Sequence, residues 1–260
     1  MNILSWNCRG AGNFQLVRDL VSLVQAHSSS IVFLCETRKS KNKRKRYRAR
    51  LGFRGFDALD SVDLSGGLAL YWHESLCLDV KTINERYIDA YVTSVAGELP
   101  WRLTCVYGEP RMEDRHCMWS SLRALHQQVN MPWVAVGDFN EAMWSFEHFS
   151  ATPRSTGQMI DFHDVLEVCG LGDLGFAGLS YTYDNRRAGR ANVKVRLDGP
   201  SRTIPGGISL AKQRSTIWWP PVRITSPYCC DVYGRSQCSQ LAGDVVSTRL
   251  CGKETLLFRR

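Results

Sequence analysis

The stretch at residues 133–143, WVAVGDFNEAM, sets the expected architecture of this chain. Its first four residues are apolar without interruption, as is typical of a strand covered on both faces. The strand then runs into Gly-Asp-Phe-Asn, which places the carboxylate of Asp138 and the carboxamide of Asn140 near its end. Strand ends in α/β folds open into ligand crevices, so the stretch predicts a polar site at the edge of a buried sheet.

Strand and helix patterns alternate on both sides of this stretch. Apolar runs bounded by Gly, Glu or Pro predict strands at residues 1–7, 30–37, 66–72, 87–95 and 101–108. Apolar residues at helical spacing predict helices at residues 14–27, 112–129 and 157–174. This order is typical of an α/β layered domain with central sheets.

The composition indicates which kinds of partner this protein can bind. The 260 residues, 44% of them hydrophobic, are enough for one large domain or one domain with a tail. The balance of 33 Lys and Arg against 25 Asp and Glu gives a net charge of +8, which favours polyanions, nucleic acid first. No signal-peptide pattern and no membrane-spanning stretch occurs, so we expect an intracellular protein, nuclear or cytoplasmic, with no membrane partner. The cysteines before residue 199 stand singly in apolar stretches and are interpreted as buried free thiols.

Three predicted strands end in oxygen-bearing side chains. Asn7 follows the first strand, Glu36 the second, and Asp138 with Asn140 the strand described above. Such ligands suit Mg²⁺ (or Mn²⁺), which Glu36 would hold. Asp138 could orient and deprotonate a water, and Asn140 could donate a hydrogen bond to a reacting phosphate without adding negative charge. Singly, each residue is more typical of a turn or a helix cap, so the hypothesis depends on the set.

The motifs WNCRG, LCETR, GGLALYW, VYGEP, GDFN, YTYDN and RLD occur in this order along the chain. In order and approximate spacing they resemble the endonuclease/exonuclease/phosphatase superfamily, and most of all the apurinic-like endonuclease domain of LINE-type (non-LTR) retrotransposons. The resemblance covers residues 1–198. It implies a four-layer α/β sandwich of the DNase I-like type. It also implies metal-dependent phosphodiester hydrolysis that nicks DNA to prime reverse transcription.

The resemblance also assigns roles to single residues of this sequence. It implies that Asn7 supports the metal site and that Glu36 binds the metal. It implies that Tyr107 approaches the phosphate, and that Asp138 and Asn140 handle the nucleophilic water.

The end of the domain departs from the family pattern. The resemblance places Thr182 and Asn185 in a loop that faces DNA, and gives Asp198 the task of orienting a catalytic histidine in a final Ser-Asp-His motif. No histidine follows Asp198 in this sequence, and the strand–helix alternation stops there. We therefore expect residues 199–260 to be a poorly ordered tail foreign to the family, attached to a fold that lacks its last helix and strand.

Loss of one nucleotide near the codons for Asp198 and Gly199 accounts for this departure. Decoded in the neighbouring frame, the codons from Asp198 onward permit a helical pattern, a short β-rich run and then Asp-His-Phe-Pro, which lies behind residues 223–227. Residues 243–259 permit further family-like text in the same frame. The hypothesis predicts an uncovered apolar face, an unpaired strand edge and a catalytically defective chain.

The basic run RKSKNKRKRYRAR at residues 38–50 allows two interpretations. Arg38, Lys43, Arg44 and Arg46 could contact the DNA backbone, or the run could be a nuclear localisation signal, since dense positive charge binds polyanions by counterion release. A solvated loop in a basic protein is equally consistent with the sequence.

Two other functions stay open at this point. One is a phosphatase of the same superfamily that acts on inositol phosphates or phospholipids. The other is a non-catalytic remnant of a transposable element that binds nucleic acid through its charge. An intact element would encode a reverse transcriptase downstream, and this chain contains none.

Overall fold

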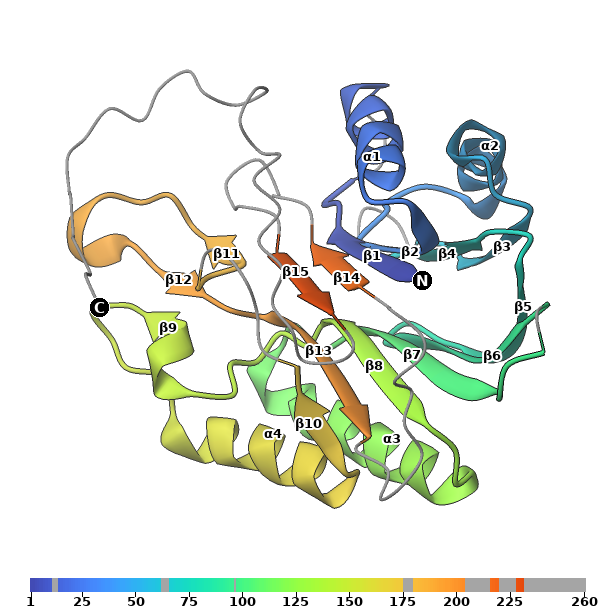
Figure 1. The fold of residues 1–260 in the computed structure, drawn as a ribbon. Coiled ribbons are helices and arrows are strands. Elements are labelled where there is room, and N and C mark those ends of the chain that lie inside the picture. Colours follow the sequence, from blue (N-terminus) through green and yellow to red (C-terminus); the bar gives the residue numbers. More distant parts are fainter. Residues whose placement is uncertain are drawn as a thin grey trace, which may run out of the picture.

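The computed structural model describes residues 1–10, 14–61, 66–95, 97–174, 180–203, 216–219 and 228–231, with the backbone alone described from residue 200 onward. Two sheets face each other at the centre of the molecule, and helices cover the outer face of each (Figure 1). This arrangement is the four-layer α/β sandwich that the sequence predicted, because each sheet can bury both of its faces only between the other sheet and a helical layer.

The first sheet has the strand order β15-β14-β1-β2-β4-β3 among the described residues. Its strands are β1 (Asn2–Asn7), β2 (Ser29–Cys35), β3 (Gly55–Leu59), β4 (Leu68–Trp72), β14 (Thr216–Trp219) and β15 (Tyr228–Asp231). β1 and β2 are parallel and are connected through helix α1 (Phe14–Ala26). Parallel strands end at the same edge of a sheet, so the residues that follow β1 and β2 meet there.

The second sheet has the order β10-β13-β8-β7-β6-β5. Its strands are β5 (Leu76–Ile83), β6 (Tyr87–Ser94), β7 (Trp101–Tyr107), β8 (Trp133–Asp138), β10 (Leu171–Asp173) and β13 (Asp198–Thr203). β7 and β8 are parallel and are connected through the 3₁₀ helix η1 (Met112–Asp114) and helix α3 (Arg115–Gln128). β13 lies antiparallel to β8, with Asp198 opposite Asp138.

A small third sheet, β11-β12-β9, lies at one side of the sandwich (Figure 1). It contains β9 (His148–Phe149), β11 (Tyr183–Asp184) and β12 (Lys194–Val195). β11 and β12 form a hairpin that carries the 3₁₀ helix η3 (Gly189–Ala191), and β9 follows the 3₁₀ helix η2 (Ser145–Glu147). The hairpin is therefore held to the segment that leaves β8.

Successive residues of each strand face opposite sides of the sheet, and the core residues alternate accordingly. Ile3 and Val136 are fully buried between the two sheets. Leu4, the next residue of β1, faces the opposite way and packs with Leu20 of α1. On the other outer face, Leu122 of α3 packs in one cluster with residues of α4 (Thr156–Val168) and β8.

The basic run at residues 38–50 is largely a helix, α2 (Lys41–Leu51), rather than a loop. Lys, Arg, Ala and Leu are strong helix formers, and basic residues in the last turn favour the negative end of the helix dipole. Gly52 ends the helix in the left-handed region at φ 74°, and its N–H bonds to the carbonyls of Ala49 and Arg48.

Several strands were not expected from the sequence. β3 and β5 carry mixed, half-buried patterns, and residues 171–173, predicted as the end of a helix, form β10 instead. β13, β14 and β15 place strands after residue 197, where we expected none. β13 pairs with β8 and β14 pairs with β1, so in the described residues neither strand has the unpaired edge that we expected.

Six cysteines in the described residues are free, as predicted. Four of them are buried, but Cys77 and Cys117 are exposed, which corrects the expectation that all are interior thiols. Among the described helices, none combines the length and apolarity needed to cross a membrane.

Candidate active site

Five predicted site residues meet where the two sheets open at one edge. Asn7 ends β1 and Glu36 follows β2 in the first sheet, while Tyr107 ends β7 and Asp138 ends β8 in the second. The parallel pairs β1–β2 and β7–β8 bring each pair of strand ends together, and face-to-face packing then brings the two pairs into contact. Asn140 lies two residues beyond Asp138, at the same edge.

Asn7 joins the two carboxylates of the site. Its Nδ2 lies 2.8 Å from Glu36 Oε1 and 2.9 Å from Asp138 Oδ2, so each N–H of the amide donates to a different carboxylate. An asparagine is suited to this position because an aspartate would add a third negative charge in the same space. The amide thereby fixes Glu36 and Asp138 close to each other.

Glu36 has a further partner at each carboxylate oxygen. The Tyr107 hydroxyl donates to Oε1 at 3.3 Å, and the Arg38 guanidinium pairs with Oε2 at 3.1 Å. Glu36 and Arg38 both have φ 49°, in the left-handed region that non-glycine residues seldom adopt. Strained backbone of this kind persists where the surroundings fix it, and it clusters at functional sites.

Asn140 is held by contacts from three directions. Its backbone N–H donates to Asp138 Oδ1 at 2.9 Å, and its Nδ2 donates to the carbonyl of Gly108 at 2.9 Å. The Arg154 guanidinium donates to the Asn140 carbonyl at 3.0 Å. These contacts support the φ of 57° at Asn140 and leave the second N–H of its amide for another acceptor.

The glycine of the GDFN motif is required by close packing. Gly137 has φ 144° inside β8, and a Cβ at this position would collide with the carbonyl of Val106 in β7. Only glycine permits both the backbone conformation and the close approach of the two strands. This approach brings Asp138 into register with Tyr107.

Burial sets the electrostatics of the site. Burial raises the pKa of the Asp138 carboxyl above its ordinary value, the hydrogen bonds from Asn7 and Asn140 oppose this, and the nearby Glu36 charge adds to it. Burial and the Glu36 carboxylate likewise raise the pKa of Tyr107, so its hydroxyl stays a neutral donor at physiological pH. Two acidic groups crowded in a desolvated space form a site that a cation would stabilise.

The donor set fits Mg²⁺ or Mn²⁺. Two carboxylates and one amide offer hard oxygen ligands, and the shared Asn7 amide shows that both carboxylates reach one small region. Glu36, whose side chain is 18% exposed, could hold such an ion, and Asn7 and Asp138 flank it.

The hairpin residues predicted to face DNA have structural partners. Thr182 Oγ1 accepts the backbone N–H groups of Leu197 and Asp198, at 2.9 and 3.2 Å. Asn185 Oδ1 accepts the N–H of Val193 at 3.0 Å, and its Nδ2 donates to a carbonyl across the hairpin. Both side chains therefore shape the hairpin and join it to the start of β13.

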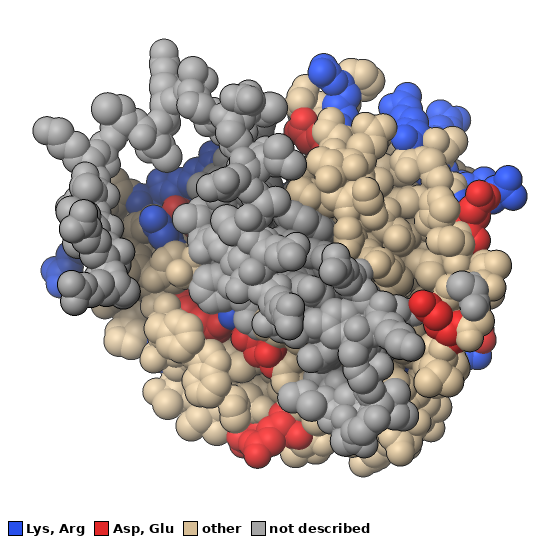
Figure 2. All heavy atoms as spheres, in the orientation of Figure 1, with Lys and Arg blue, Asp and Glu red and all other residues tan. Residues whose placement is uncertain are grey.

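The basic residues predicted to contact DNA separate into three groups. Arg38 pairs with Glu36 inside the site. Lys43 and Arg46 are exposed on α2, on a side of the molecule where basic side chains gather (Figure 2). Arg44 is fully buried, and its guanidinium donates to the carbonyls of Leu59 and Leu68, so the prediction of a DNA contact is wrong for this residue. Side-chain directions in a helix repeat about every 3.6 residues, and Arg44 lies on the face of α2 that is turned toward the core.

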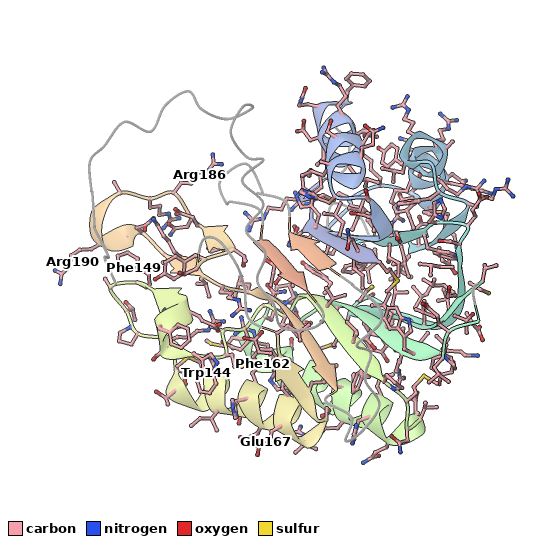
Figure 3. All side chains as sticks on the ribbon, in the orientation of Figure 1. Trp144, Phe149, Phe162, Glu167, Arg186 and Arg190 are labelled. Carbon is pink, nitrogen blue, oxygen red and sulfur yellow. The ribbon has the colours of Figure 1, made fainter. Side chains whose placement is uncertain are left out.

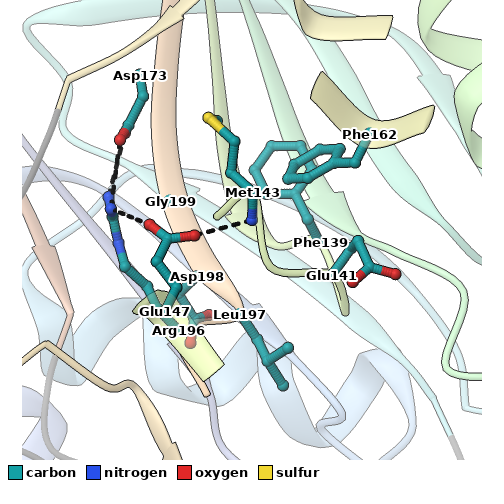
Figure 4. Close-up of a pocket in the computed structure, with 10 residues that line it drawn as sticks. All are labelled: Phe139, Glu141, Met143, Glu147, Phe162, Asp173, Arg196, Leu197, Asp198 and Gly199. Carbon is teal, nitrogen blue, oxygen red and sulfur yellow. Dashed lines mark hydrogen bonds and ion pairs between the residues drawn. The ribbon is translucent and has the colours of Figure 1, made fainter. Parts of the chain in front are cut away.

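Two buried ion networks beside the site were not predicted. Glu141, next to Asn140, pairs with Arg115 and Arg154. Arg196 lies 2.7 Å from Glu147 and 3.1 Å from Asp173 at a pocket that Asp198 also lines (Figure 4). Buried charges need such partners, but sequence gives no sign of which charges are buried.

Arg9 was also missed. Its guanidinium lies 5.1 Å from the centre of the Tyr183 ring, a cation–π contact between the loop after β1 and the hairpin. Arg9 belongs to the WNCRG motif, which was the only signal that pointed to it.

Comparison with known families gives one match that covers most of the chain. The model of the Endonuclease/Exonuclease/phosphatase family matches residues 4–222. No curated protein matches the sequence.

Solved structures share the fold. The endonuclease domain of TRAS1, a telomere-specific non-LTR retrotransposon, superposes with a TM-score of 0.56 at 15% identity, over 77% of this chain and 84% of that domain. The AP endonuclease LMAP from Leishmania major gives a TM-score of 0.63 at 13% identity, over 87% of this chain and 85% of its own. The 3' phosphatase NExo from Neisseria, bound to a product DNA hairpin, gives 0.62 at 15% identity, over 88% and 97%.

Proposed function

The chain belongs to the endonuclease/exonuclease/phosphatase family, and from this premise we propose that its site is built for metal-dependent hydrolysis of phosphodiester bonds in DNA. One observation carries the proposal: a single amide, Asn7 Nδ2, lies within 3 Å of Glu36 and Asp138, although the carboxylates belong to different sheets. Two carboxylates brought together at the edge of a fold, one of them buried with a raised pKa, are typical of a functional site.

Glu36 would hold the metal. The Asn7 amide, which donates to both carboxylates, would keep Asp138 in place beside Glu36. A bound Mg²⁺ or Mn²⁺ supplies Lewis-acid polarisation of a phosphate oxygen and stabilisation of negative charge. Arg38 and Tyr107 hold the two oxygens of Glu36, which limits the directions in which this carboxylate can turn.

Asp138 and Asn140 would act on water and phosphate. The raised pKa of Asp138 makes it a better proton acceptor than an exposed aspartate, so it can take a proton from an attacking water. Asn140, fixed by Asp138, Gly108 and Arg154, has one amide N–H left to donate to a phosphate oxygen. Tyr107, a neutral donor at the same edge, would approach the phosphate.

We propose DNA as the substrate and a LINE-type retrotransposon as the origin of the chain. The net charge of +8 and the exposed basic residues of α2 favour a polyanion. The fold is shared with the TRAS1 endonuclease domain and with a phosphatase bound to a DNA hairpin, which supports the same class of substrate. In an intact element the domain would be followed by a reverse transcriptase.

We also propose that this copy is catalytically defective. The sequence after Asp198 contains no histidine, so a group that would contact the scissile phosphate is missing. Loss of one such contact to a transition state lowers a rate by about 10²–10³-fold. Glu36, which would bind the metal, is retained together with Asn7 and Asp138 beside it, so this chain should still bind metal without the catalysis.

Nicking of supercoiled plasmid in the presence of Mg²⁺ tests the proposal. The restored chain, in which one nucleotide is returned near the codons for Asp198 and Gly199, is expected to nick, and the present chain is not. Glu36→Ala in the restored chain should abolish nicking. Equal Glu36-dependent nicking by both chains would show that the histidine is dispensable, and no nicking by either would overturn the assignment as a DNA endonuclease. Release of phosphate from inositol phosphates instead would favour a phosphatase.

A further inference from the structure

Three aromatic side chains are exposed in the segment that leaves the active site. After Asn140 and the buried Glu141, the chain carries Trp144, Phe146 and Phe149, which are 43%, 66% and 54% exposed. Single exposed apolar residues are ordinary, but three large exposed rings within six positions of the chain, here called the cluster, leave apolar area in water at a cost in free energy. The proposed chemistry uses none of them.

Two rings of the cluster, those of Trp144 and Phe146, have defined neighbours. The rings of Trp144 and Phe146 lie nearly parallel, with centroids 6.5 Å apart and an angle of 8°. His163 of α4 meets the Trp144 ring edge-on at 5.0 Å. The backbone N–H of Trp144 donates to Glu147 at 3.1 Å, and Glu147 is itself paired with Arg196. Trp144 is therefore held through its backbone and contacts neighbouring rings on two sides.

Positive charge borders the cluster on one side. Phe149 of β9 lies opposite Lys194 of β12, so the two side chains share one face of the small sheet. The hairpin beyond it carries three exposed arginines, Arg186, Arg187 and Arg190. Figure 3 shows Arg186, Arg190, Phe149 and Trp144 along the same side of the molecule.

Negative charge borders the cluster on the other side. Asp161, Asp164 and Glu167 are exposed on α4. Glu167 lies below Trp144 in Figure 3. A polyanion that reaches the rings is repelled by α4 and attracted by the hairpin, so its path is confined to the side of the arginines. The positive charge of the hairpin therefore favours nucleic acid, a polyanion, over a basic partner or a purely apolar one.

We propose that Trp144, Phe146 and Phe149 form a stacking surface for unpaired bases of a single-stranded nucleic acid, whose phosphates meet the hairpin arginines. Bases in a duplex have their faces covered, whereas unpaired bases expose π-faces that stack on aromatic side chains without sequence preference. The proposal rests on the proposed function only for the class of ligand. It adds that a substrate with an unpaired segment beside the cut is bound best.

Binding without metal tests this inference apart from catalysis. Fluorescence anisotropy with a labelled 20-nucleotide oligo(dT) and with a 20-base-pair duplex, both in EDTA, compares the full chain with Trp144→Ala and Phe146→Ala. We expect each variant to bind oligo(dT) about tenfold or more weakly and to bind duplex with less than about twofold change, given the usual contribution of one stacked base. Leu99→Ala, which truncates a 69% exposed leucine elsewhere, should change neither affinity.

A spectroscopic signal distinguishes stacking from a general loss of surface. A single 2-aminopurine in the oligo(dT) should lose fluorescence on binding to the wild-type chain and to Trp144→Phe, which retains a ring, but not to Trp144→Ala. An equal loss of affinity for both nucleic acids, no loss for either, or no binding of oligo(dT) by the wild type would overturn the inference. Sedimentation velocity tests one further outcome. If the wild-type chain is a dimer and Trp144→Ala is a monomer, the cluster is an interface between copies, which would also overturn the inference. Plasmid nicking by the restored chain decides the proposed function separately.

Discussion

The amide of Asn7 donates to the carboxylate of Asp138 across the gap between the two sheets, at 2.9 Å. Asn7 ends β1 in the first sheet and Asp138 ends β8 in the second, 131 positions later. The same amide also donates to Glu36, so it joins residues of both sheets into one site.

Loss of this amide should weaken the site without unfolding the protein. Asn7→Ala in the restored chain is expected to lower Mg²⁺ affinity or the nicking rate by about 10–100-fold, as for other groups that orient metal ligands. Nicking rates measured across a range of Mg²⁺ concentrations separate the two effects. Asn130→Ala, the same change at an exposed position, should leave both values unchanged.

Metal binding should persist in the present chain, which we propose is catalytically defective. Saturating Mg²⁺ or Mn²⁺ is expected to raise the unfolding temperature, since a ligand at 100 times its Kd adds about 2.7 kcal/mol to the free energy of unfolding. The stabilisation should vanish in Glu36→Ala. Differential scanning fluorimetry after EDTA treatment measures it, and an unchanged response in the variant would contradict the assignment of Glu36.

Asp138 should make the stability of the metal-free chain depend on pH. Its pKa is raised in the folded state, chiefly by burial, so its charged form is disfavoured by folding. Its contribution is fully present below the unfolded pKa and is lost as pH rises through the raised, folded pKa. Asp138→Asn removes this loss, so the variant should melt a few degrees above the wild type at pH 7.5, with a smaller difference at pH 4. Thermal melts in EDTA over that range measure the trend, and a variant less stable at every pH would contradict it.

Substitution of Arg44 should lower the stability of the protein, whereas substitution of its neighbour Lys43 should affect DNA binding instead. Arg44→Ala removes the guanidinium that donates to the carbonyls of Leu59 and Leu68, at a cost of about 1–3 kcal/mol for each carbonyl left unsatisfied. Lys43→Ala, at an exposed position of the same helix, should leave stability nearly unchanged. It should reduce the dependence of DNA affinity on salt concentration by about one unit of slope. Urea denaturation and salt-dependent anisotropy measure the two effects.

If one nucleotide was lost, as we propose, its return should complete the fold. The restored chain is expected to unfold more cooperatively and to bind less of the dye ANS than the present chain, because the added helix and strand would cover an apolar face. Sequencing of the gene and its cDNA checks the premise directly. Codons after Asp198 that are incompatible with the alternative frame would refute the nucleotide loss.

The strand ends of the site could be predicted because their signal is local. Each of Asn7, Glu36 and Asp138 follows a continuous apolar run, and parallel strands bring such ends to one edge. The burial of Arg44 could not be predicted, because a run of basic residues has no apolar stripe to show which side chain turns inward. The Arg196 network depends in the same way on partners far apart in sequence, Glu147 and Asp173.

The sequence by itself determined the alternation of strands and helices, the polar strand ends and the absence of histidine after Asp198, because period and residue type are local properties of a chain. Only the tertiary structure decided that one Asn7 amide serves two carboxylates, and that Arg44 is a core residue while Lys43 is exposed. It also decided that Trp144 and Phe146 form an exposed stacked pair. These facts depend on how sheets and helices pack across large separations in sequence, and packing is not encoded in any short stretch.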